Sequence, residues 1–137
     1  MKLMVSILVG VMILVSNSIN AQKQTITASV VNVTSNDGKV AFALYNKTNF
    51  MAMPLQAKNG KIVDGVSTVI FENIEAGEYA IICYHDKNDN DRMDFQENGM
   101  PLEDYGASNN VVSFGPPQYD DSKFMVTDKK VNLEIKF

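Results

Sequence analysis

Hydrophobic and polar residues alternate along several short stretches of the chain, which is the pattern of β-strands that bury one face. The predicted strands are residues 25–33, 39–45, 66–71, 78–85, 111–114, 123–126 and 131–137. Residues 78–85 form the most apolar of these stretches, and residues 131–137 alternate strictly. No window shows the period of a helix over about a dozen residues. The pattern therefore predicts an all-β protein, an antiparallel β-sandwich of short strands joined by turns.

Two of the connecting segments carry information of their own. Asp37-Gly38 is a strong hairpin signal, so we expect residues 25–33 and 39–45 to pair as a hairpin. Residues 86–110 contain no regular strand pattern, and we expect one long irregular insertion there. A long ordered loop in a compact domain is usually functional or held together by a metal ion.

The beginning of the chain has the three parts of a secretory signal peptide. Lys2 supplies a positive charge, residues 3–15 are almost entirely apolar, and a short polar stretch ends in the small residue Ala21. An apolar run of about 13 residues is short for a membrane span, which needs about 20. We expect cleavage after Ala21, with an uncleaved anchor as the alternative. Residues 1–21 are then a signal peptide and residues 22–137 a single β-sandwich domain without a membrane span, secreted to the periplasm or outer surface of a bacterium.

Composition narrows the classes of function. The chain has 12 Lys and Arg against 16 Asp and Glu, a formal net charge of -4, and no run of basic residues. Nucleic-acid binding requires a basic surface, so we expect no nucleic-acid partner. The single cysteine, Cys83, excludes an internal disulfide and a zinc site built from cysteines. We expect Cys83 to be a small buried hydrophobic residue.

The candidate chemistry lies in the twelve residues from Asp86 to Glu97. Side chains with oxygen fall at positions 1, 3, 5, 9 and 12 of this segment, which are Asp86, Asn88, Asn90, Asp94 and Glu97. Position 7 is Arg92, where a calcium loop uses the backbone carbonyl. This is the spacing of the twelve-residue calcium loop, whose alternate residues point inward at six to eight oxygen ligands. The spacing therefore predicts one Ca²⁺, bound by these six residues.

Two features of the segment affect that prediction. Position 6 is Asp91, where the usual loop has Gly because the turn requires a positive φ, a conformation that Asp tolerates better than most residues. Five carboxylates crowd into twelve residues and are offset only by Lys87 and Arg92, which favours a bound cation. The alternatives are a solvated acidic turn without a metal, and a different metal ion.

Several further residues could take part in a site. His85, the only histidine, precedes the loop and could be a ligand, an acid-base group or a structural hydrogen-bond donor. The side chains that could add ligands from the remainder of the long insertion are those of Glu103, Asp104 and Asn109. Met51 and Met53 form a Met-x-Met pair that could bind copper(I), or could fill a gap or anchor a loop.

Two resemblances support the sandwich. Residues 71–81 run from an aromatic strand end through a turn with Gly to Tyr79, and are similar to the hairpin of transthyretin-like (prealbumin-like) and carboxypeptidase-regulatory-like sandwiches. A second set of motifs extends over most of residues 25–137: His85-Asp86-Lys87-Asn88-Asp89-Asn90, Met93-Asp94, residues 99–110, Gly115-Pro116-Pro117 and Asp121-Ser122-Lys123-Phe124. This series resembles the secreted bacterial family called domain of unknown function 2141, which normally has Gly at or near Asp91. The resemblance implies fold and compartment and implies no activity.

These observations favour a non-enzymatic role. We expect a secreted module with a structural or binding function in the cell envelope, which recognises a protein, a glycan or an envelope component, and no catalytic residue is assigned. One alternative is a metal-dependent hydrolase that uses His85. Another is a periplasmic carrier of a small ligand or a metal.

Overall fold

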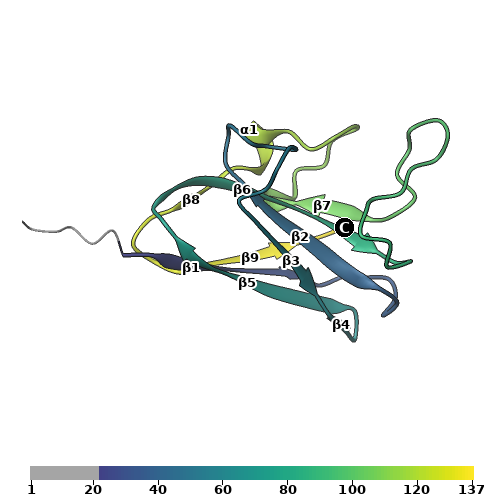
Figure 1. The fold of residues 1–137 in the computed structure, drawn as a ribbon, viewed down its shortest axis with the longest axis horizontal. Coiled ribbons are helices and arrows are strands. Elements are labelled where there is room, and N and C mark those ends of the chain that lie inside the picture. Colours follow the sequence, from purple (N-terminus) through teal and green to yellow (C-terminus); the bar gives the residue numbers. More distant parts are fainter. Residues whose placement is uncertain (1–21) are drawn as a thin grey trace, which may run out of the picture.

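The architecture is two β-sheets that face each other, seen in the computed structural model, which describes residues 22–137 (Figure 1). The predicted signal peptide lies outside the described residues. The strands are β1 (Gln24–Val30), β2 (Lys39–Tyr45), β3 (Gln56–Gly60), β4 (Ile62–Val63), β5 (Val66–Ile74), β6 (Gly77–Asp86), β7 (Tyr105–Ala107), β8 (Phe124–Val126) and β9 (Val131–Ile135). Two single helical turns are η1 (Ser108–Asn110) and α1 (Tyr119–Ser122). No helix within residues 22–137 has the length and apolar character to cross a bilayer.

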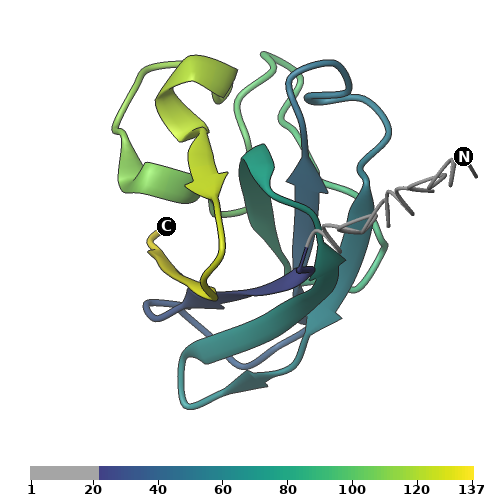
Figure 2. The ribbon, with the colours of Figure 1, turned by 90° about the vertical axis from the view of Figure 1, so that its left-hand side faces the viewer.

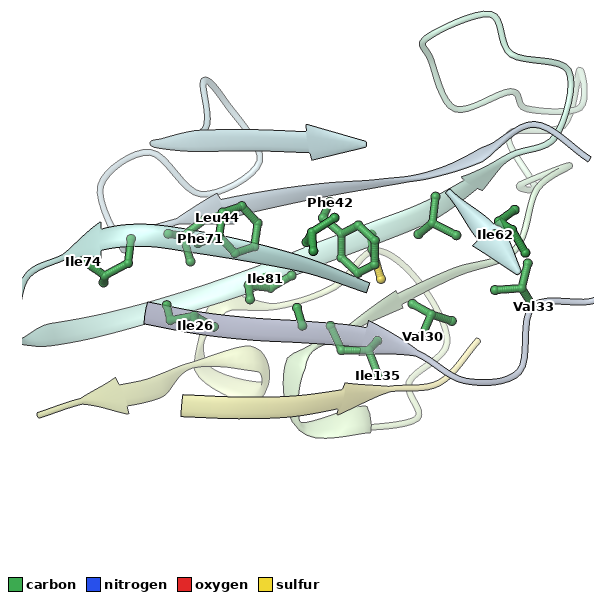
Figure 3. Close-up of a cluster of buried hydrophobic side chains, with 14 of the residues drawn as sticks. Ile26, Val30, Val33, Phe42, Leu44, Ile62, Phe71, Ile74, Ile81 and Ile135 are labelled. Atoms are coloured by element: carbon green, nitrogen blue, oxygen red, sulfur yellow. The ribbon is translucent and has the colours of Figure 1, made fainter. Parts of the chain in front are cut away.

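The core lies between the sheets and follows from the alternation of the strands. One sheet has the order β4-β5-β1-β9, and the other has the order β3-β2-β6-β7 with β8 paired to β6. Ile26, Ala28 and Val30, alternate residues of β1, are fully buried, as are Phe71 of β5 and Leu44 of β2. These side chains point from both sheets into one apolar layer (Figure 3). The prediction of an all-β sandwich is therefore confirmed.

The pairing of β9 with β1 is parallel, which differs from the purely antiparallel expectation. The chain order explains the difference. β8 runs antiparallel to β6 and ends at Val126 opposite Gly77, where β6 begins. The start of β6 lies near the start of β1, because β5 ends at Ile74 opposite Gln24. The chain therefore enters β9 from the end at which β1 begins, and β9 can only run in the same direction (Figure 2).

The predicted hairpin between β1 and β2 is wrong. β1 pairs with β5 and β9, whereas β2 pairs with β3 and β6, so residues 31–38 cross from one sheet to the other. Gly38 has a φ of 66°, and a Cβ on it would lie 1.9 Å from the carbonyl oxygen of Asp86. Glycine is required there for close approach to the acidic loop. A tight two-residue hairpin joins β4 to β5 instead, at Asp64-Gly65, where both residues have positive φ.

The turn after β5 also connects the two sheets, so residues 71–81 do not form a hairpin. The Tyr79 hydroxyl donates to the carbonyl of Glu75 (2.9 Å) and fixes this crossing. Residues 111–114, predicted as a strand, form no strand, and the side chains of Val112 and Phe114 are 94% and 108% exposed. These apolar residues therefore belong to the surface and not to the core.

We expect Gly38→Ala to destabilise the protein strongly, because the added methyl group overlaps the Asp86 carbonyl and the backbone has a positive φ. The expected loss of unfolding free energy is about 3 kcal/mol, from overpacking plus backbone strain. Gly99→Ala is the matched control, since Gly99 also has a positive φ but a Cβ there meets nothing within 4 Å. That variant should lose only about 1 kcal/mol in urea unfolding. Equal losses in the two variants would show that the contact with Asp86 has no role.

Candidate metal-binding loop

The buried carboxylate of Asp86 organises the acidic loop, which we define as residues 86–104. β6 places Asp86 at its last position, where it is completely buried. Its Oδ1 accepts the N–H of Asn90 (3.0 Å) and its Oδ2 accepts the N–H of Asp91 (2.9 Å). Asp91 has a φ of 63°, the positive value expected at position 6 of a calcium loop. The loop therefore wraps around a single side chain that two backbone groups hold in place.

Asp86 is ionised despite its burial. Burial by itself raises the pKa of this carboxyl group, because the charged form loses its hydration. The two N–H groups of Asp91 and Asn90, followed by the ammonium of Lys39 at 3.5 Å, more than offset that cost and hold the pKa of Asp86 below its ordinary value. The charge is thus an integral part of the folded state.

Lys39 is the cation that the loop contacts most closely. Its Nζ lies 2.6 Å from Oδ1 of Asp89 and 2.6 Å from Oδ1 of Asp91. Hydrogen bonds to these two carboxylates raise the pKa of Lys39 well above its ordinary value. Sequence reasoning missed this residue because it counted only cations inside the loop. The register of the sheet, which pairs Lys39 directly with Asp86, is the information that was lacking.

The side chains at positions 3, 5 and 9 of the loop converge. Oδ2 of Asp94 accepts hydrogen bonds from the amides of Asn88 (2.7 Å) and Asn90 (2.8 Å). The guanidinium of Arg92 lies beside the same carboxylate, with 3.5 Å between Nε and Oδ1. The side chains of three predicted ligands are therefore brought together, and Asp86 contacts this group through the backbone N–H of Asn90.

Position 12 does not close the loop. The side chain of Glu97 is exposed and makes no hydrogen bond or ion pair with residues 22–137. Glu103 has that role, since its two carboxylate oxygens accept the N–H groups of Lys87 (3.1 Å) and Asp94 (3.1 Å). Among the residues that the structure describes, no group of three His, Cys, Asp or Glu side chains is placed to hold a metal ion. Any oxygen cage here must draw on asparagine and backbone oxygens.

Two further candidates, His85 and Asn109, have structural hydrogen bonds. His85 is buried, and its ring Nε2 lies 2.8 Å from the carbonyl oxygen of Asp37. The backbone N–H of His85 donates to the carbonyl of Asp104 (2.8 Å). It ties the crossing at residues 31–38 to the loop. Asn109 lies outside the loop in η1, and its amide donates to the carbonyls of two residues at the end of α1 and just beyond it, Asp121 and Lys123.

A second feature lies beside the loop, an apolar cavity of about 290 Å³. It is lined by Met51, Ile82, Met93, Phe95, Gly99, Met100, Pro101, Tyr105, Gly115, Pro116 and Pro117. Met53 of the Met-x-Met pair is not among these residues and is 81% exposed. The sequence signal that could have revealed the cavity is the series of large apolar residues between the acidic ones from Met93 onward.

The order of motifs, the sandwich and the long loop agree with one family of sequences. The model of the family described as "Uncharacterized protein conserved in bacteria (DUF2141)" matches residues 28–134. The chain belongs to the DUF2141 family. The match extends from β1 to β9 and includes the whole acidic loop of this DUF2141 protein. Neither the search of curated proteins nor the search of solved structures found a match.

We expect the stability of this DUF2141 protein to depend on pH through Asp86. Because the folded pKa is lowered, the carboxylate stabilises the fold above its unfolded pKa of about 3.9, and that contribution is lost as pH falls through the folded value. Asp86→Asn should lower the free energy of unfolding by about 2–4 kcal/mol at pH 7. The NH₂ group of Asn replaces one of the two carboxylate oxygens, so one backbone N–H of the loop loses its acceptor. The difference in unfolding free energy between the variant and the wild type should become smaller below pH 4, where Asp86 of the wild type becomes protonated. Thermal melts at several pH values measure this, with exposed Asp121→Asn as the control; a constant difference would contradict it.

Proposed function

We propose that this protein is a non-enzymatic module of the bacterial cell envelope whose acidic loop binds one Ca²⁺. The observation that carries the proposal is the convergence of Asn88, Asn90 and Asp94, three side chains at calcium-loop spacing, on one point. Amide oxygen and nitrogen exchange places on a half-turn of the side chain, which directs Oδ1 of the asparagines toward the same point. The ion is structural: it would stabilise the loop and, by mass action, the folded domain.

The proposed ligand set follows the spacing of a calcium loop. Side-chain oxygens of Asp86, Asn88, Asn90 and Asp94 and the carbonyl of Arg92 supply most of a calcium shell, and Glu97, Glu103 or water completes it. Binding has two costs: the half-turn of Asn90 gives up its 3.2 Å hydrogen bond from the N–H of Arg92, and the ammonium of Lys39 already neutralises Asp86 and its neighbours. We therefore expect affinity in the extracellular range, about 10⁻⁴–10⁻³ M.

The environments of the reactive side chains support a non-enzymatic role. His85 is 2% exposed and its ring is committed to the carbonyl of Asp37. Cys83 is completely buried, and burial raises the pKa of its thiol far above neutrality, so the nucleophilic thiolate is not formed. Ser108 is buried and bonded to the backbone of β6 and α1. Each of these groups has a structural partner in place of a substrate.

The calcium proposal predicts a thermal shift. For the processed chain, residues 22–137, 10 mM Ca²⁺ should add about 1.4–2.7 kcal/mol of stability relative to chelator if the dissociation constant lies in the expected range. Asp94→Ala should abolish the calcium-dependent rise in Tm, and Asp121→Ala, an exposed aspartate in α1, should retain it. Differential scanning calorimetry with Ca²⁺, Mg²⁺ and chelator measures all three proteins.

The variant Lys39→Met distinguishes a loop that binds calcium from a loop whose charge is neutralised by Lys39 alone. The variant loses the contacts to Asp89 and Asp91, so it should be less stable than wild type in chelator. Removing the competing ammonium should also enlarge the calcium-dependent rise in Tm. A wild type and a Lys39→Met variant that are both indifferent to Ca²⁺ would reduce the segment to an acidic turn closed by Lys39.

The envelope location rests on residues 1–21, and it predicts processing. When the full chain is expressed in a bacterial host, we expect the protein in the periplasmic fraction to begin at Gln22, because a small residue at Ala21 suits signal peptidase. Intact mass measures this directly. Ala21→Arg should leave the unprocessed chain at the membrane. Recovery of the full-length chain in the cytoplasm would contradict the proposed location.

A further inference from the structure

The apolar cavity beside the acidic loop has three walls from separate parts of the chain. The loop between β2 and β3 contributes Met51, and residues 93–101 of the acidic loop contribute a second wall. Residues 115–117 form the third wall, and Ile82 of β6 is part of the lining. The volume of about 290 Å³ is near the lower end for binding pockets, which suits one or two large side chains.

The lining is chemically uniform. No charged side chain lines the cavity, and three of its large apolar residues stand open to solvent: Met51 (54% exposed), Phe95 (56%) and Met100 (58%). A partner that covers these side chains would remove their apolar surface from water, at about 25 cal/mol for each Å². Methionine is unbranched and polarisable, and it adapts to partners of different shape, which favours an apolar anchor.

The walls are preformed. In the acidic loop, the backbone N–H of Leu102 donates to the backbone carbonyl of Asp94 (2.9 Å), and that of Gln96 donates to the carbonyl of Met100 (2.8 Å). These bonds make a short antiparallel hairpin. The Tyr105 hydroxyl donates to the carbonyl of Gly115 (3.2 Å) and holds the third wall against β7. Binding then requires little ordering of the protein, so less of the interaction energy is lost.

The surroundings of the cavity are strongly acidic. The acidic loop has seven carboxylates and two cationic side chains. Asp94 and Glu97 lie between lining residues in the sequence. Arg92 lies beside the carboxylate of Asp94, whereas Glu97 is exposed and free of any ion pair with residues 22–137. Lys39 neutralises the opposite end of the loop, at Asp86, Asp89 and Asp91. An occupant that carries positive charge next to its apolar group would match both features.

We propose that this cavity docks a partner protein through an apolar side chain flanked by lysine or arginine in an extended peptide segment. The inference rests on the binding role proposed above and names the chemical class of the partner. The unpaired carboxylate of Glu97 disfavours apolar ligands that carry a carboxylate, such as fatty acids. The calcium ion and the partner would act on neighbouring parts of the same loop, the ion at residues 86–94 and the partner at Phe95 and Met100.

Three matched synthetic peptides test the proposal by fluorescence anisotropy. Each has the centre Leu-Phe-Leu, flanked on both sides by two lysines, two serines or two glutamates. We expect saturable binding of the lysine peptide to the processed chain, at least about tenfold weaker binding of the serine peptide, and no binding of the glutamate peptide; tenfold corresponds to about 1.4 kcal/mol. Equal affinity for the lysine and serine peptides would overturn the role of charge and assign the cavity to a neutral ligand.

Two double variants test the position of the site. Phe95→Ser with Met100→Ser should weaken binding of the lysine peptide at least about tenfold, which is about 1.4 kcal/mol. The control is Val63→Ser with Met125→Ser, two residues outside the cavity that are 58% and 59% exposed. It should bind like wild type, and equal losses in the two variants would overturn the site.

The titrations are run in chelator and in Ca²⁺, alongside the thermal melts. Absence of lysine-peptide binding with an intact calcium shift overturns the docking site and leaves the calcium proposal standing. Binding lost only in the cavity variant, without any calcium shift in wild type, supports the docking site and overturns the calcium proposal.

Discussion

A single buried carboxylate connects the acidic loop of this protein to its fold. Asp86 ends the central strand of one sheet, accepts two N–H groups of the loop that follows, and lies against Lys39 of the neighbouring strand. Its carbonyl oxygen occupies the space that a side chain at residue 38 would need. The crossing between sheets at Gly38 and the start of the acidic loop both depend on this residue. A buried charge is tolerated here because each of its oxygens has a hydrogen-bond donor or a cation.

Local patterns in the sequence predicted the strands well and their connections poorly. Alternation located β2 and β6 almost to the residue, because burial of one face dictates it. The two Asp-Gly dipeptides look alike in sequence, yet Asp64-Gly65 makes a hairpin, and Asp37-Gly38 accompanies a crossing between sheets. The difference lies in which neighbour the glycine must approach, and only the tertiary structure specifies that neighbour. β3 and β7 escaped notice because short edge strands bury few side chains.

In the candidate site too, the sequence predicted local groupings of residues and missed contacts between distant segments. Spacing alone brought Asn88, Asn90 and Asp94 into one group, since a tight turn directs alternate residues inward. Spacing could not anticipate Lys39, which reaches the loop through sheet register, or Glu103, which replaces Glu97 in closing it. The apolar cavity needs residues from three distant segments, so no single motif contains it. Acidic and apolar residues are interleaved along one loop, so the same loop carries the converging polar side chains and part of the lining of the apolar cavity.

The parallel pairing of β9 with β1 affects the order in which the chain can fold. β1 is an inner strand of its sheet only once β9 has joined it, and the side chain of Asn32 then bonds the backbone of Phe137 at both its N–H and its carbonyl. The two halves of this closure are about a hundred residues apart, which makes it a late and slow step. A chain that emerges amino-terminus first keeps an open sheet edge until β9 appears. The synthesis of β1 and the closure of its sheet are therefore separated in time, because closure requires the whole chain up to β9.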